Sequence, residues 1–104
     1  MATVAHFEIH ASNPELLVEF YSRLFGWRFE SWGPPGQYWV IRTKQDGDER
    51  GSDGGLVPRK GDRPGDAQPV SAYVVTIDVA SATNTLTLVE ELGGVVVVPL
   101  RAVV

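Results

Sequence analysis

NPELLVEFYSRLFGW, residues 13–27, is the stretch that decides the fold of this 104-residue chain. Asn13 is a typical helix-capping residue, and the proline and glutamate that follow it favour a first helical turn. Gly26 favours the left-handed backbone that ends a helix. Between them, apolar side chains recur at helical spacing and form one wide stripe: Leu16, Leu17, Phe20, Tyr21, Leu24 and Phe25. The stretch predicts an amphipathic helix with one face packed against the rest of the domain.

Short strands flank this helix. VAHFEIHA at residues 4–11 alternates polar and apolar side chains, the period of a strand with one polar face. After the helix, WRFESW at 27–32 and YWVIRT at 38–43 are rich in strand-forming residues, with a glycine-proline turn between them. GGLVP at 54–58 predicts a short fourth strand.

The second half of the chain repeats the order strand, helix, strand. VSAYVVTI at 70–77 predicts a strand, Asp78 or Ser81 caps a helix that runs to Leu92, and residues 95–98 predict a further strand. His6 and Gly26 are 20 residues apart, and so are Tyr73 and Gly93. This repeat predicts one α+β domain with a first module at about 1–60, a linker at about 61–69 and a second module at about 70–104.

Composition limits the classes of function. The formal net charge of -4 argues against nucleic acid as a partner, because phosphate binding needs a basic face. The chain has no cysteine, which excludes disulfides, thiolate catalysis and cysteine-bound zinc. The first residues do not have the pattern of a signal peptide, and no apolar run is long enough to span a membrane. We therefore expect a cytoplasmic protein that does not bind membranes.

Taken in order, several short motifs resemble the glyoxalase / bleomycin-resistance / extradiol-dioxygenase (vicinal oxygen chelate) superfamily. The helix-ending Phe-Tyr…Leu-Phe-Gly-Trp pattern is the most specific of them. The motifs cover nearly the whole chain: HFEI at 6–9, NPE at 13–15, FY at 20–21, LFGW at 24–27, YWVI at 38–41, GGL at 54–56 and ELGGVV at 91–96.

The resemblance implies paired βαβββ modules, each with its sheet curled around a concave pocket and its helix on the outer face. Some relatives hold a divalent metal ion in the pocket, and others only sequester a small molecule. The family normally has two more strands after the one near Val95, and one of them carries an acidic metal ligand. We therefore expect the second module to be incomplete at its C-terminus, with a truncated or unseen tail, or another chain, completing the sheet.

His6 occupies the place where metal-binding relatives carry their first ligand, and the alternative is a histidine that only forms hydrogen bonds in the pocket. The corresponding places in the second module are Ser71 or Tyr73, and neither is a good ligand for such ions. Glu8 would point into the same pocket as a general base, or it would be a carboxylate bonded to His6 or to backbone. His10 lies near the strand end and is expected at the rim or in solvent.

The remaining pocket candidates are chosen for contact area or close approach. Tyr38, Trp39 and Trp32 suit a flat or hydrophobic ligand, although one of Tyr38 and Trp39 must face the helix. Gly55 allows close backbone approach at the pocket mouth. Ser71 and Tyr73 are placed by the second module's first strand.

These observations favour a protein that binds a small organic molecule in a concave sheet pocket, with no cofactor or an incomplete metal site. The first alternative is a divalent-metal-dependent lyase, isomerase or dioxygenase that uses His6 and Glu8. The second is a non-catalytic structural dimer with a vestigial pocket. Because the apolar stretch at 95–104 would be an aggregation hazard at an open sheet edge, we predict a homodimer.

Overall fold

The computed structural model describes residues 2–45, 47, 50–69 and 74–100 of the chain. The chain is a small α+β protein, and in the described residues it has two helices and one mixed four-stranded sheet. It divides into two compact units, Met1–Arg63 and Pro64–Val104. The boundary between them lies inside the segment that the sequence predicts as a linker.

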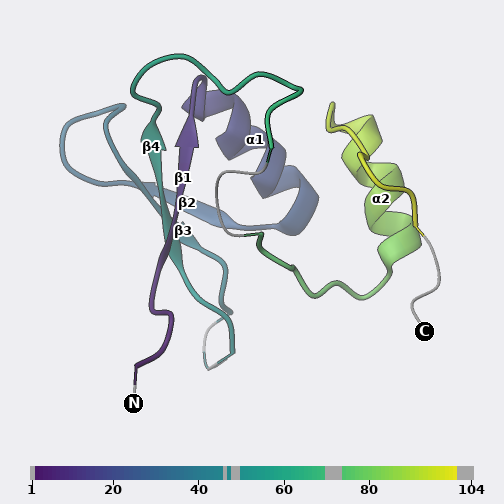
Figure 1. Cartoon of the computed structure of the whole chain (residues 1–104). Coiled ribbons are helices and arrows are strands. Elements are labelled where there is room, and N and C mark those ends of the chain that lie inside the picture. The colour runs from purple at the N-terminus through teal and green to yellow at the C-terminus, as the bar shows by residue number, and fades with distance from the viewer. Residues whose placement is uncertain (1, 46, 48–49, 70–73, 101–104) are drawn as a thin grey trace. The chain divides into compact units, whose positions relative to one another are not determined.

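The first unit holds this sheet, whose strands lie in the spatial order β1 (Phe7–Ala11), β4 (Gly54–Pro58), β3 (Trp39–Arg42) and β2 (Arg28–Ser31) (Figure 1). β1 runs parallel to β4, whereas the pairs β4–β3 and β3–β2 are antiparallel. Along the chain the elements follow in the order strand, helix and three strands: β1 (Phe7–Ala11), α1 (Pro14–Phe25), β2 (Arg28–Ser31), β3 (Trp39–Arg42) and β4 (Gly54–Pro58).

Local signals set both ends of α1. The Asn13 side chain accepts a hydrogen bond from the Leu16 amide at 3.4 Å, as an N-cap does. At the other end Gly26 has a φ of 73°, and its amide donates to the Ser22 carbonyl at 2.9 Å. Only glycine adopts this left-handed conformation at little cost, so the cap that the sequence predicts is confirmed.

The core lies between α1 and one face of the sheet. Among the described residues three apolar side chains are buried, Ala11, Ile41 and Leu56, and further apolar side chains pack around them. Phe7 on β1 contacts Trp27 with ring centroids 6.2 Å apart. Because α1 contacts β1, β2 and β4, it covers this face. Within the described residues of the first unit, no helix covers the opposite face, which is called the open face of the sheet.

An aromatic group joins α1 to the start of β2. The Tyr21 and Trp27 rings stack with centroids 5.2 Å apart, and Phe25 lies 4.9 Å from Trp27. Burial raises the pKa of the Tyr21 phenol above its ordinary value. This packing holds the chain against α1 where it leaves the helix and enters β2.

The second unit contains α2 (Ala82–Glu91). Of the two predicted caps, Ser81 is the one used, since its hydroxyl accepts a hydrogen bond from the Asn84 amide at 3.2 Å. The predicted strands at 70–77 and 95–98 are wrong in their described parts, because residues 74–77 and 95–98 form no strand. Valine favours strands only where a neighbouring strand offers hydrogen bonds and packing, and these segments are exposed.

Neither helix found in the described part of the chain has both the length and the apolar character that a membrane crossing requires.

Candidate functional site

The open face of the sheet carries the polar side chains that the sequence singled out. Two adjacent glycines in β4 show which side is which. A Cβ atom added to Gly54 would collide with the Phe7 ring on the core side, whereas one added to Gly55 would collide with Tyr38. Since side chains alternate along a strand, Glu8 and His10 share the face of Gly55, and Phe7 and Ile9 share the face of Gly54.

Tyr38 crosses the sheet over Gly55 and reaches His6. Its hydroxyl lies 3.2 Å from His6 Nε2, within hydrogen-bond distance. The phenol can cross only because residue 55 is a glycine. A Cβ at Gly55 would lie 2.6 Å from Tyr38 Cζ and closer still to the hydroxyl oxygen. The structure thus brings together three of the predicted pocket residues, from segments far apart in the sequence.

Glu8 pairs with a different histidine from the one expected. Its Oε1 lies 2.8 Å from His10 Nε2, and the two side chains are 45% and 50% exposed. Residues two apart on a strand project from the same face, which puts them within reach of each other. A pair this exposed adds little stability. Because both side chains are about half exposed, a ligand can reach them.

The two tryptophans considered with Tyr38 lie in different surroundings. Trp32 is 70% exposed, and its ring meets the Tyr38 ring edge-on with centroids 6.2 Å apart. Trp39 packs against the buried core and is opposite the buried Leu56 in the strand pairing, on the helix side of the sheet. The structure therefore brings Tyr38 and Trp32, but not Trp39, to the face of Gly55.

The second module's site residues, Ser71 and Tyr73, lie outside the described residues. Over the described ranges, no group of three or more histidine, aspartate or glutamate side chains is arranged to hold a metal ion. His6 is bonded to Tyr38, and Glu8 to His10, so these donors do not converge on one point. The residues described do not fit the divalent ion that the family resemblance implies for some members.

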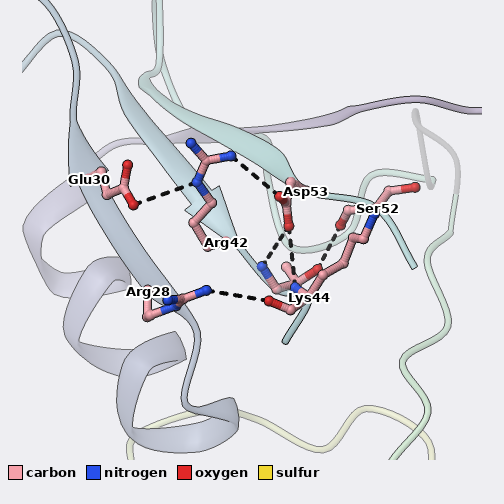
Figure 2. Close-up of polar contacts among 7 residues, drawn as sticks. Arg28, Glu30, Arg42, Lys44, Ser52 and Asp53 are labelled. Atoms are coloured by element: carbon pink, nitrogen blue, oxygen red, sulfur yellow. Dashed lines mark hydrogen bonds and ion pairs between the residues drawn. The ribbon is translucent and has the colours of Figure 1, made fainter. Parts of the chain in front are cut away.

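A polar network that the sequence did not predict braces the connection between β3 and β4 (Figure 2). Arg42 lies between two acids, 3.6 Å from Glu30 and 3.5 Å from Asp53. The backbone amides of Thr43 and Lys44 donate to Asp53 Oδ1 at 2.9 and 3.3 Å. The alternation of β3 and β4 puts this network on the face of Gly55.

Two opposing influences set the pKa of the Asp53 carboxyl. Burial raises it, but hydrogen bonds from the Thr43 and Lys44 amides, together with the hydrogen bond and charge of Arg42, lower it by more. The pKa is therefore below its ordinary value of 3.8. The ionised Asp53 carboxylate therefore anchors the loop between β3 and β4 through the two amides. The charge of Arg42 is balanced by Asp53 and Glu30.

A signal for this network was present in the sequence. Ile41 on β3 is opposite Gly54 on β4 in the antiparallel pairing. The next residues along, Arg42 and Asp53, are therefore opposite each other and project from the same face. Opposite charges at such positions stabilise a strand pair. Finding them required the register of β3 on β4, which the sequence alone did not fix.

No family model and no curated protein matches the chain. Among solved structures it is similar to a protein described as "Structure from the mobile metagenome of V. Pseudocholerae. VPC_CASS1". The similarity has a TM-score of 0.60 at 17% sequence identity, and it covers 95% of this chain and 73% of that chain. At this identity the likeness concerns the fold alone.

Proposed function

We propose that the chain is a glyoxalase-like domain that binds a small organic molecule on the open face of its sheet, without a complete metal site. One observation carries the proposal. His6 and Tyr38 meet over Gly55, and Glu8 is paired with Gly55 in the strand register, on the sheet face that α1 does not cover. Polar and aromatic side chains that share one face of a sheet are typical of a ligand site.

The architecture of the first unit supports the family part of this proposal. Its order of strand, helix and three strands is the order that the resemblance implies for one module. In the second unit, α2 ends shortly before Gly93, as α1 ends before Gly26. We propose that the segment at about 70–104 belongs to a partial second copy of the module, with α2 as its helix.

The chemistry of the site suits a ligand that carries oxygen atoms. The Tyr38 hydroxyl and the His6 imidazole can each donate or accept a hydrogen bond, and the Glu8 carboxylate accepts bonds from hydroxyl or amine groups. The general-base role predicted for Glu8 requires a ligand that excludes water, since this side chain is about half exposed.

A thermal-shift screen of small organic molecules tests the proposal, using the wild type, Glu8→Gln and a matched control, Glu19→Gln. Glu19 pairs with Arg23 on α1 at 3.6 Å, in a more exposed setting away from the site. We expect a ligand that raises the unfolding midpoint of the wild type and the control, and raises that of Glu8→Gln less. No stabilising ligand, or equal shifts in all three proteins, would contradict the proposal.

Metal analysis separates this function from the metal-dependent alternative. Protein purified without added metal is analysed for bound divalent ions, alongside His6→Ala. We expect substoichiometric metal in both. A stoichiometric divalent ion that is lost in His6→Ala would favour the lyase, isomerase or dioxygenase instead.

A further inference from the structure

We propose that Gly55 is the positioning residue of this site, and that the Tyr38–His6 pair it makes possible binds a planar aromatic ligand through one hydroxyl oxygen. The inference rests on the proposed function and adds to it a class of ligand and a reason for the glycine.

The first step is steric. Tyr38 lies just before β3, His6 lies just before β1, and β4 separates these two strands in the sheet. The phenol therefore has to cross β4 to reach the imidazole, and it crosses at Gly55. Any side chain at that position would occupy the place of the phenol. Because Tyr38 is only half-buried, its ring would swing out toward solvent rather than disrupt the core.

The second step concerns the shared proton. One hydrogen atom lies between the Tyr38 oxygen and His6 Nε2, which are 3.2 Å apart. If His6 donates it, the Tyr38 hydroxyl is free to donate to a ligand. If Tyr38 donates it, the phenol oxygen still has a lone pair to accept with. In both cases a ligand hydroxyl can form a hydrogen bond with the Tyr38 oxygen, because a hydroxyl both donates and accepts.

The third step is the exposed ring beside the pair. Trp32 is 70% exposed, although tryptophan has a large apolar surface that is usually covered. Its ring centroid is 6.2 Å from that of Tyr38 at an interplanar angle of 69°, so the indole packs edge-on beside the ring that carries the hydroxyl. An aromatic ligand that packs on Trp32 can place its oxygen at the Tyr38–His6 pair. The exposed Trp32 indole and the Tyr38 hydroxyl together therefore favour an aromatic ligand that carries a hydroxyl group.

The positioning role is tested first without ligand, from the NMR chemical shifts of the His6 imidazole nitrogens. The variants are Gly55→Ala and Tyr38→Phe, with Gly65→Ala as the control. A Cβ at Gly65 would meet only Gln68 Cγ at 3.9 Å, an ordinary contact. We expect Gly55→Ala and Tyr38→Phe to shift the His6 signals in the same direction, and Gly65→Ala to leave them unchanged. Unchanged His6 signals in a folded Gly55→Ala protein would overturn the positioning role.

A double variant covers the case in which Gly55→Ala fails to fold. Truncation of the phenol in Tyr38→Ala/Gly55→Ala removes the collision, so this protein should be as stable as Tyr38→Ala. If the double variant is further destabilised as much as Gly55→Ala destabilises the wild type, the glycine does not act through Tyr38, and the proposal is wrong.

The ligand class is tested with three probes: phenol, toluene, which lacks the hydroxyl, and cyclohexanol, which lacks the aromatic ring. Binding is followed at the Trp32 indole and the Gly55 amide by NMR titration. We expect phenol to bind the wild type at least about fivefold more tightly than either other probe, and to lose about that factor in Tyr38→Phe and Gly55→Ala.

Equal affinities for the three probes, or no saturable binding of phenol, would overturn the proposed ligand class. If a different molecule from the thermal-shift screen still moves the His6 and Gly55 signals, the proposed function stands and only this inference fails. If no molecule moves them, both fail.

Discussion

Asp53 shows how a single carboxylate can hold a loop in place. It accepts hydrogen bonds from two consecutive backbone amides and pairs with Arg42, which in turn pairs with Glu30. The sequence contains these opposite charges but does not single out Asp53, because residues 44–69 contain charges of both signs and resemble any solvated loop. Only the register of β3 on β4 selects Asp53 from among them.

We predict that Asp53→Asn reduces the dependence of stability on acidic pH. The folded-state pKa of this carboxyl is below its ordinary value of 3.8, so the unfolded chain takes up the proton first. Its contribution is therefore present above that value and is lost as the pH falls through the folded-state pKa. Urea unfolding between pH 6 and pH 3 should show a smaller loss of free energy in Asp53→Asn than in the wild type, with Asp62→Asn behaving like the wild type. Parallel pH profiles for all three proteins would refute the prediction.

The site residues show a similar division between what alternation predicts and what it leaves open. Alternation places His6, Glu8 and His10 on one face, and the structure agrees. It could not show that Glu8 bonds to His10 while His6 bonds to Tyr38, because that choice depends on side-chain rotamers and on the absence of a Cβ at Gly55, which leaves room for the phenol. Alternation also requires that only one of Tyr38 and Trp39 faces the helix. The pairing of β3 with β4 shows that this residue is Trp39.

At the scale of elements, predictions succeeded where the signals are local. The cap at Asn13 and the glycine at residue 26 lie next to the helix that they end, and β4 begins and ends at the predicted residues. The segments 74–77 and 95–98 are as rich in valine as a true strand, yet they form none. A strand needs a partner, and a sequence pattern does not say where the partner is.

We predict that Gly26→Ala lowers the free energy of unfolding by about 1–2 kcal/mol, because alanine must adopt the left-handed backbone at this cap. Denaturant unfolding measures the change. Gly65→Ala is the control, because its backbone is not left-handed and a Cβ there meets no close neighbour. Equal stability of Gly26→Ala and the wild type would mean that the cap does not contribute as argued.

At the scale of the whole molecule, the second unit presents much apolar surface. Val97 is 86% exposed, and other large apolar side chains of the same unit are exposed as well: Val74, Val75, Ile77, Val95, Val98 and Leu100. Isolated apolar residues on a surface are ordinary, but runs of them on neighbouring positions mark interaction surfaces.

We predict that the chain forms a homodimer and that Val97→Lys shifts it toward the monomer in sedimentation velocity. The physical reason is the cost of burying a charge where an apolar side chain was covered. Val4→Lys is the matched control, because Val4 is 80% exposed but belongs to the first unit. A monomeric wild type at micromolar concentration, or a dimer that Val97→Lys leaves intact, would contradict this prediction.

The central claim is that the open face of the first unit's sheet is where a small molecule binds. The most direct measurement is an NMR chemical-shift map of the protein with the best molecule from the thermal-shift screen. We predict that the changes gather on that face, at the Glu8 and Gly55 amides and at the Trp32 indole. Changes confined to the outer surface of α1 or to the second unit would contradict the claim.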